Sequence, residues 1–152
     1  MSSRILVTVV AEGPTEEKFI KRIVAPYLIS KNITMIPTVL HGNVNFERVK
    51  RDVINSLKNN KFMAVSYFVD YYGLKDWPQK DSIPANATPR QIAGILNKAA
   101  KDVICGEIAD DFNPTKRLIP FMAVHDLRLF FSATVTCLHR NWEYPKASSM
   151  KF

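Results

Sequence analysis

The chain has 152 residues, of which 47% are apolar and 23% are charged. This composition excludes a disordered or fibrous chain and is typical of one globular domain with a sizeable core. The formal net charge of +7 is compatible with a polyanionic partner such as nucleic acid, although solvated surface charge explains it equally well.

The cysteines and the hydropathy pattern indicate the expected cellular location. Cys105 and Cys137 stand in no spacing that would build a zinc site. The N-terminus carries no secretory signal, and no apolar run is long enough to span a bilayer. We therefore expect a cytoplasmic protein with no membrane partner, and the sequence leaves homo-oligomer formation open.

The first predicted elements are a strand and a helix joined by a sharp turn. Residues 4–11 form a continuous, β-rich apolar run, which predicts a strand buried on both faces. The turn Gly13-Pro14-Thr15-Glu16 leads into a helix expected over about 15–30, and Pro26 predicts a kink or an early end. The inner side of this helix should carry six apolar residues: Phe19, Ile20, Ile23, Val24, Tyr27 and Leu28.

A second strand, a second helix and a third strand follow. Residues 33–39 predict a strand that Pro37 places at a sheet edge or makes irregular. The apolar spacing over about 45–60 predicts a helix, and residues 62–69 predict the strand at the centre of the sheet. Residues 71–88 contain a tryptophan, prolines and small polar residues, which indicates an ordered surface loop.

The remaining elements complete an alternating pattern. Thr88-Pro89 is expected to cap a further helix, residues 117–124 predict a strand, and the apolar residues 127–135 predict a last helix. This order indicates an α/β fold with three layers: a mostly parallel sheet with helices on both faces. Residues 1–140 are expected to form one domain, and residues 141–152 an irregular tail.

Acidic residues follow three of the predicted strands. Glu12 ends the first, Asp70 ends the third, and His125-Asp126 ends the last. The carboxyl ends of parallel strands meet at one edge of a sheet, where open α/β folds bind their ligands. Mg²⁺ prefers a few carboxylate oxygens together with water and substrate phosphate. The sequence therefore predicts a metal site of Glu12, Asp70 and Asp126, with His125 in support, suited to phosphoryl transfer.

Each of these residues also has a purely structural interpretation. Glu12 could accept hydrogen bonds from backbone amides in its turn, although a carboxylate after an apolar run is costly to bury without a cation or a donor. Asp70 could cap the turn Tyr71-Tyr72-Gly73. His125 could be a hydrogen-bonded structural residue, and Asp126 could be the N-cap of the last helix.

Two further acidic residues and a basic group favour structural interpretations. Glu16 and Glu17 are expected to complement the positive end of their helix. Residues 48–61 contain a basic group that should form the solvated outer face of a helix, and a second group follows at Lys116-Arg117. Nucleic acid as a partner is thus permitted by the charge pattern, without being specified by it.

Four motifs in order resemble one protein family. They are Glu12-Gly13-Pro14-Thr15-Glu16, Pro26-Tyr27-Leu28, Asp70-Tyr71-Tyr72-Gly73-Leu74, and Arg117-Leu118-Ile119-Pro120-Phe121 running to His125-Asp126. Together they resemble the bacterial family catalogued as domain of unknown function 4276 (DUF4276), which is itself similar to the Toprim fold of topoisomerases, primases and certain nucleases.

The resemblance implies a catalytic site and also shows where this chain departs from it. In Toprim proteins a glutamate and an Asp-x-Asp pair hold magnesium and assist phosphodiester chemistry. Glu12 matches the glutamate and Asp70 the first aspartate, whereas Tyr72 stands at the second. After His125, where the family tends to show two glutamates, the chain has Asp126 and then Arg128. Its last residues resemble nothing expected at that point, which is compatible with a truncated family member.

Two functions from different classes follow. The first is a nuclease, a phosphodiesterase dependent on Mg²⁺ or Mn²⁺, that acts on nucleic acid. The second, implied by the resemblance, is a non-catalytic module with a degenerate metal site that partners an ATPase in bacterial defence. Nucleotide binding ranks last because the chain has no glycine-rich phosphate loop.

Overall fold

A computed structural model of the chain describes residues 3–124. These residues form four parallel strands and the helices that connect them. The strands are β1 (Ile5–Ala11), β2 (Ile33–Val39), β3 (Ala64–Asp70) and β4 (Leu118–Ala123). The helices are α1 (Pro14–Phe19), α2 (Ala25–Ile29), α3 (Phe46–Asn59), α4 (Pro89–Glu107) and α5 (Pro114–Arg117), with a π-helical turn at Ile20–Val24 and 3₁₀ turns at Tyr71–Gly73, Lys80–Ser82 and Asp110–Phe112.

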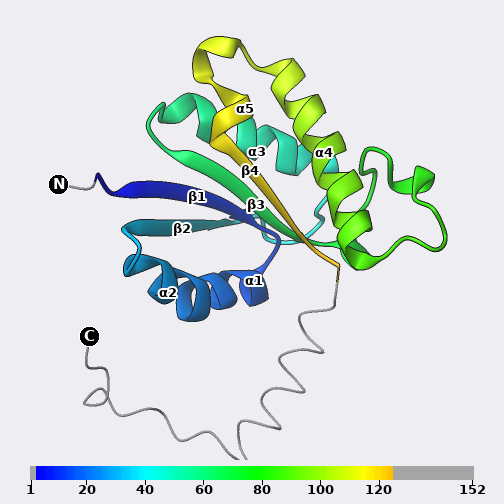
Figure 1. The fold of residues 1–152 in the computed structure, drawn as a ribbon, viewed down its shortest axis with the longest axis horizontal. Coiled ribbons are helices and arrows are strands. Elements are labelled where there is room, and N and C mark those ends of the chain that lie inside the picture. Colours follow the sequence, from blue (N-terminus) through cyan, green and yellow to red (C-terminus); the bar gives the residue numbers. More distant parts are fainter. Residues whose placement is uncertain (1–2, 125–152) are drawn as a thin grey trace, which may run out of the picture.

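The strand order is β2-β1-β3-β4, and every pairing is parallel. Figure 1 shows α1 and α2 on one side of this sheet and α3 and α4 on the other. The predicted α/β class, with helices on both faces of a parallel sheet, is therefore confirmed. The expected edge position of the strand with Pro37 is also confirmed, because β2 is the outermost strand beside β1.

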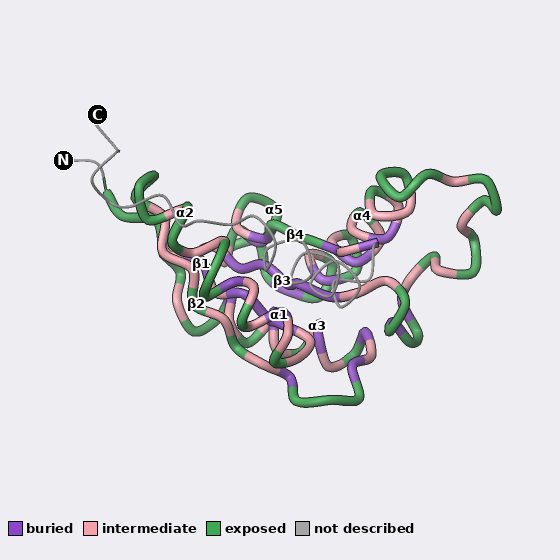
Figure 2. The backbone as a smooth tube through the Cα atoms, turned by 90° about the horizontal axis from the view of Figure 1, so that it is seen from below, coloured by how far each residue is buried: buried purple, intermediate pink, exposed green. Residues whose placement is uncertain are grey.

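Most of the core lies between the sheet and the α3–α4 layer. Its strand residues include Val65, Tyr67 and Val69 of β3, all fully buried, and α3 contributes Val49 and Val53. Figure 2 shows the buried residues concentrated along the central strands of the sheet. A smaller core on the opposite face joins β1 to the first helical segment.

The first helical segment differs from the regular helix that the sequence predicts. It begins as α1, passes through the π-helical turn Ile20–Val24, and ends as α2. A proline inside an α-helix removes one N–H and crowds the carbonyl four residues earlier, and the π-helical turn lies directly before the segment that contains Pro26. The wider turn also rotates the apolar stripe. Ile23 and Tyr27 were expected to face inward and are instead exposed, while Ile20 is buried.

The segment between β3 and α4 is anchored by Trp77. Its side chain is buried, its Nε1 donates to the backbone oxygen of Leu96 at 3.2 Å, and its ring meets those of Phe46 and Tyr67 edge-on. At the end of the loop Thr88 caps α4 reciprocally with Gln91. The prediction of an ordered loop followed by a capped helix is confirmed.

Candidate functional site

Glu12 and Asp70 lie side by side at the carboxyl edge of the sheet. Glu12 directly follows β1, Asp70 ends β3, and these two strands are hydrogen-bonded neighbours. The backbone N–H of Glu12 donates to the oxygen of Phe68 at 3.1 Å, which continues the pairing to the end of the strand. The structure therefore brings together Glu12 and Asp70, which 58 residues separate in sequence.

This position is the topological switch point of the sheet. The chain leaves β1 toward β2 on one side, and it leaves β3 toward β4 on the other. The two connections diverge between β1 and β3, and open α/β sheets bind ligands in the crevice formed at such a divergence. Glu12 and Asp70 stand on its two sides.

Backbone amides orient both carboxylates. Oε2 of Glu12 accepts a hydrogen bond from the backbone N–H of Asp70 at 3.0 Å. Oδ1 of Asp70 accepts one from the N–H of Tyr72 at 3.0 Å and so caps the 3₁₀ turn Tyr71–Gly73. The structural roles considered for both residues are thus present. They do not exclude a cation, because a carboxylate offers about four acceptor positions.

Gly73 fits closely against the Glu12 carboxylate. A Cβ atom at position 73 would lie 2.9 Å from Oε1 of Glu12, which is shorter than real Cβ contacts. The glycine therefore allows the 3₁₀ turn to sit against this side chain. The glycine is visible in the sequence motif Asp70-Tyr71-Tyr72-Gly73. The reason for it, the contact with Glu12 after the neighbouring strand, is not visible there.

The other predicted acidic residues behave differently. Glu17 pairs with Lys21 on the helix surface, as a helix-end residue would. Glu16 is buried, with 7% of its surface exposed, and its Oε2 would lie 3.4 Å from a Cβ atom at Gly13. The sequence did not indicate this burial, because an acidic residue in the first turn of a helix was expected to complement the positive helix end. His125 and Asp126 lie outside the described residues.

Within residues 3–124 no group of three or more His, Cys, Asp or Glu side chains could hold a metal ion. Among the described residues, Glu12 and Asp70 are the predicted ligands that the structure places next to each other. Tyr72, where the resemblance places a second aspartate, is 68% exposed, and its ring meets that of Tyr71 edge-on.

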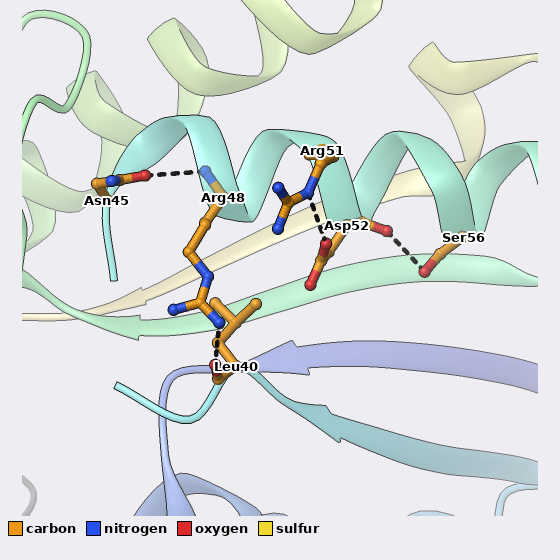
Figure 3. A network of polar contacts seen from close by, with 6 residues as sticks. All are labelled: Leu40, Asn45, Arg48, Arg51, Asp52 and Ser56. Atoms are coloured by element: carbon orange, nitrogen blue, oxygen red, sulfur yellow. Dashed lines mark hydrogen bonds and ion pairs between the residues drawn. The ribbon is translucent and has the colours of Figure 1, made fainter. Parts of the chain in front are cut away.

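Much of the predicted basic surface on α3 is engaged in the fold. Figure 3 shows Arg48 reaching the backbone oxygen of Leu40, and Arg48 also donates to the oxygen of Gly42. Lys50 contacts Glu47 at 3.0 Å and Glu107 at 2.8 Å, and these bonds raise the pKa of the lysine. Arg51 lies 3.4 Å from Asp52.

Arg117 is the strongest case of a basic residue used by the fold. Its guanidinium donates to four backbone oxygens, and burial lowers the pKa of the group. The acceptors are the carbonyls of Leu57, Asn60, Met63 and Phe112. The interpretation of the basic group over residues 48–61 as a solvated face is therefore wrong for Arg48, and both Arg48 and Arg117 use their guanidinium groups to satisfy backbone carbonyls.

Comparison with known proteins gives one match. No curated protein and no solved structure matches this chain. In the residues that the structure describes, no helix is long and apolar enough to cross a membrane. Residues 11–150 match the family described as Domain of unknown function (DUF4276), which covers more than half of the chain. The chain therefore belongs to the DUF4276 family.

Proposed function

We propose that the protein is a Mg²⁺-dependent phosphodiesterase, a Toprim-like nuclease acting on nucleic acid, with Mn²⁺ as an alternative cation. The observation that supports this proposal is the pairing of Glu12 and Asp70 at the switch point of a parallel sheet. Carboxylates at this position face the crevice where α/β proteins bind phosphorylated ligands. The net charge of +7 favours a polyanionic substrate.

The chemistry of the donor set fits a hard divalent cation. Mg²⁺ is usually held by one or two carboxylates and keeps several waters or substrate oxygens. Glu12 and Asp70 each accept a backbone N–H bond, and carboxylates that ligate metals are commonly oriented by such bonds. When bound, the cation would polarise a phosphoryl oxygen and lower the pKa of a coordinated water.

The residues of this chain would then take distinct roles. Asp70 would hold the cation, and Glu12 would hold it or act as the general base that accepts a proton from water. Asp126 is proposed as a further ligand, and His125 as a supporting group. In the sequence, His125 and Asp126 follow β4 after Val124. The last residue of β4, Ala123, pairs with Asp70.

A cation titration tests the first step of this proposal. Isothermal calorimetry with Mg²⁺ or Mn²⁺ should show saturable binding to the wild type and a loss of binding in Asp70→Asn. The asparagine oxygen can still accept the Tyr72 N–H bond, so the variant removes charge while keeping the cap. Absence of binding in the wild type would contradict the proposal.

A cleavage assay tests the second step. Wild-type protein with Mg²⁺ or Mn²⁺ should cleave DNA or RNA, and Glu12→Gln should reduce cleavage by about 10²–10⁴-fold, the usual contribution of a general base. The glutamine oxygen can still accept the N–H of Asp70. Cleavage that is unchanged in Glu12→Gln would exclude the proposed site.

A second candidate function is a non-catalytic module that partners an ATPase in bacterial defence. The observation that favours it is Tyr72, an exposed phenol where the Toprim-like site would have a carboxylate. Under this proposal, an ATPase encoded by a neighbouring gene should co-purify with the protein. The complex should survive Glu12→Gln and Asp70→Asn, and a complex lost in those variants would count against a non-catalytic role.

A further inference from the structure

The two faces of β4 differ sharply in their burial. On the α4 side, Leu118 is fully buried and Met122 is 4% exposed. On the other side, Ile119 and Phe121 are 55% and 51% exposed. Successive strand residues alternate between the faces of a sheet. Strands of parallel sheets are normally buried on both faces, so β4 presents an open apolar surface on the face that α1 shares.

This open surface continues a row of stacked aromatic rings. Phe19 of α1 stacks on Phe68 of β3 with ring centroids 5.7 Å apart. Phe68 in turn stacks on Phe121 with centroids 5.0 Å apart and planes inclined by 5°. The small core of this face thus extends from α1 across β3 to β4, where its last ring is half exposed. We call the exposed β4 residues Ile119 and Phe121 the open face.

The topology shows why the connecting helices leave this face open. Along the strand order, the connections from β2 to β3 and from β3 to β4 both run toward the β4 edge of the sheet. Right-handed crossovers in the same direction place α3 and α4 on one face. On the other face, α1 and α2 pack beside β1 and β2. A segment that follows the last strand is not bound by the crossover rule.

The chain itself supplies an occupant of suitable chemistry. Residues 125–152 follow β4, and the family match extends through them to residue 150, so this part belongs to the shared domain sequence. Residues 127–138 are rich in large apolar side chains, whereas residues 139–152 are mostly polar or basic. The apolar residues are Leu127, Leu129, Phe130, Phe131, Val135 and Leu138.

We infer that residues 127–138 pack on the open face and complete the apolar layer that α1 and α2 begin. Burial of two half-exposed β4 side chains and several aromatic or aliphatic partners provides the driving force. The docking does not rest on the proposed function.

The test uses the full chain and two variants. One changes the segment 127–138, and the other changes the open face. One is the segment variant Phe130→Ser with Phe131→Ser, and the other is the face variant Ile119→Thr with Phe121→Thr. The matched control, Ser132→Asp with Thr136→Asp, adds charge to the same segment without removing an apolar residue. The readouts are binding of the dye anilinonaphthalene sulfonate and amide hydrogen exchange of residues 118–123.

The segment variant should increase dye fluorescence and accelerate exchange of the amides of β4 by about tenfold or more, because local opening becomes easier. The control should leave both readouts close to wild type. The combined segment and face variants should accelerate exchange no further than the larger single effect, because contacting residues are not additive. Neither readout requires a cation, so the result is independent of the metal site.

Two outcomes would overturn the inference. Unchanged dye binding and exchange in the segment variant would show that residues 127–138 do not cover the open face. A wild-type dimer in analytical ultracentrifugation that dissociates in the face variant, and not in the segment variant, would assign the face to a second copy of the chain.

Discussion

At both ends of the sheet, charged side chains hydrogen-bond to backbone groups. The two ends differ in how many bonding positions those side chains have left for a ligand. At the amino end, Arg117 donates to four carbonyl oxygens from the end of α3, the connection between α3 and β3, and the 3₁₀ turn Asp110–Phe112. At the carboxyl end, Glu12 and Asp70 accept N–H bonds from Asp70 and Tyr72. All three residues belong to the motifs that resemble the family.

The difference lies in the remaining binding capacity of the groups. A guanidinium has five N–H donors, and Arg117 directs four bonds to the protein itself, which leaves little for a ligand. A carboxylate has about four acceptor positions and can serve a backbone amide and a cation together. Presence in a motif therefore does not by itself separate a structural role from the proposed chemistry, and the position of Glu12 and Asp70 at the switch point is what supports the proposal.

Replacement of Arg117 should produce the largest loss of stability. Arg117→Ala leaves four carbonyls without their charged donor. Bonds to charged groups contribute about 1.5–3 kcal/mol each, and water replaces some of them, so we expect a loss of about 3 kcal/mol in the free energy of unfolding. Urea denaturation followed by circular dichroism measures this loss.

The neighbouring lysine provides the control for this prediction. Lys116 is exposed in α5, and Lys116→Ala should change stability by no more than about 0.5 kcal/mol. If Arg117→Ala kept wild-type stability and instead weakened binding of nucleic acid, Arg117 would be a phosphate ligand and the contrast between the two ends would be wrong.

Gly73→Ala should weaken cation binding at the carboxyl end and should destabilise the protein less than Arg117→Ala. The added methyl would come within 2.9 Å of Oε1 of Glu12, so the carboxylate or the 3₁₀ turn must move. We expect a loss of about 1 kcal/mol in unfolding free energy and a tenfold or greater loss of Mg²⁺ affinity, comparable to the loss of an orienting contact at a metal site. Calorimetry and urea denaturation together separate the two effects.

Gly94→Ala is the matched control for this substitution. Nothing lies within 4 Å of a Cβ atom at position 94, and the residue is inside α4. Alanine is favoured over glycine in a helix, so this variant should gain about 0.5–1 kcal/mol and keep its cation affinity. Equal cation affinity in Gly73→Ala and the wild type would show that the position of Glu12 does not matter for binding.

The carboxyl end was largely predictable from the sequence. Apolar runs ended by Glu12 and Asp70 predicted two buried strands, and alternating helices predicted that the strands are parallel. These features depend on the apolar pattern of each strand and on the right-handed crossover between parallel strands, and both apply to α/β chains in general. The adjacency of β1 and β3, which creates the switch point, follows from the strand order that the structure shows.

Other features depend on contacts between distant residues. Arg117 read as part of a basic group because a sequence does not display unpaired carbonyls 54 to 60 residues away. Ile23 and Tyr27 were predicted on the inner face because a regular helical period cannot contain the π-helical turn before Pro26. The clearance that requires Gly73 is likewise set by Glu12 on another strand.

The smallest predicted effect is a gain at the carboxyl end. Tyr72 is 68% exposed, so Tyr72→Asp should fold normally and place a third negative charge near Glu12 and Asp70. An added charge at about 4 Å contributes about 1 kcal/mol in water, so Mg²⁺ affinity in calorimetry should rise roughly fivefold. Tyr72→Asn, which adds no charge, is the control. Equal affinity in both variants would show that the crevice beside Glu12 and Asp70 does not bind the cation.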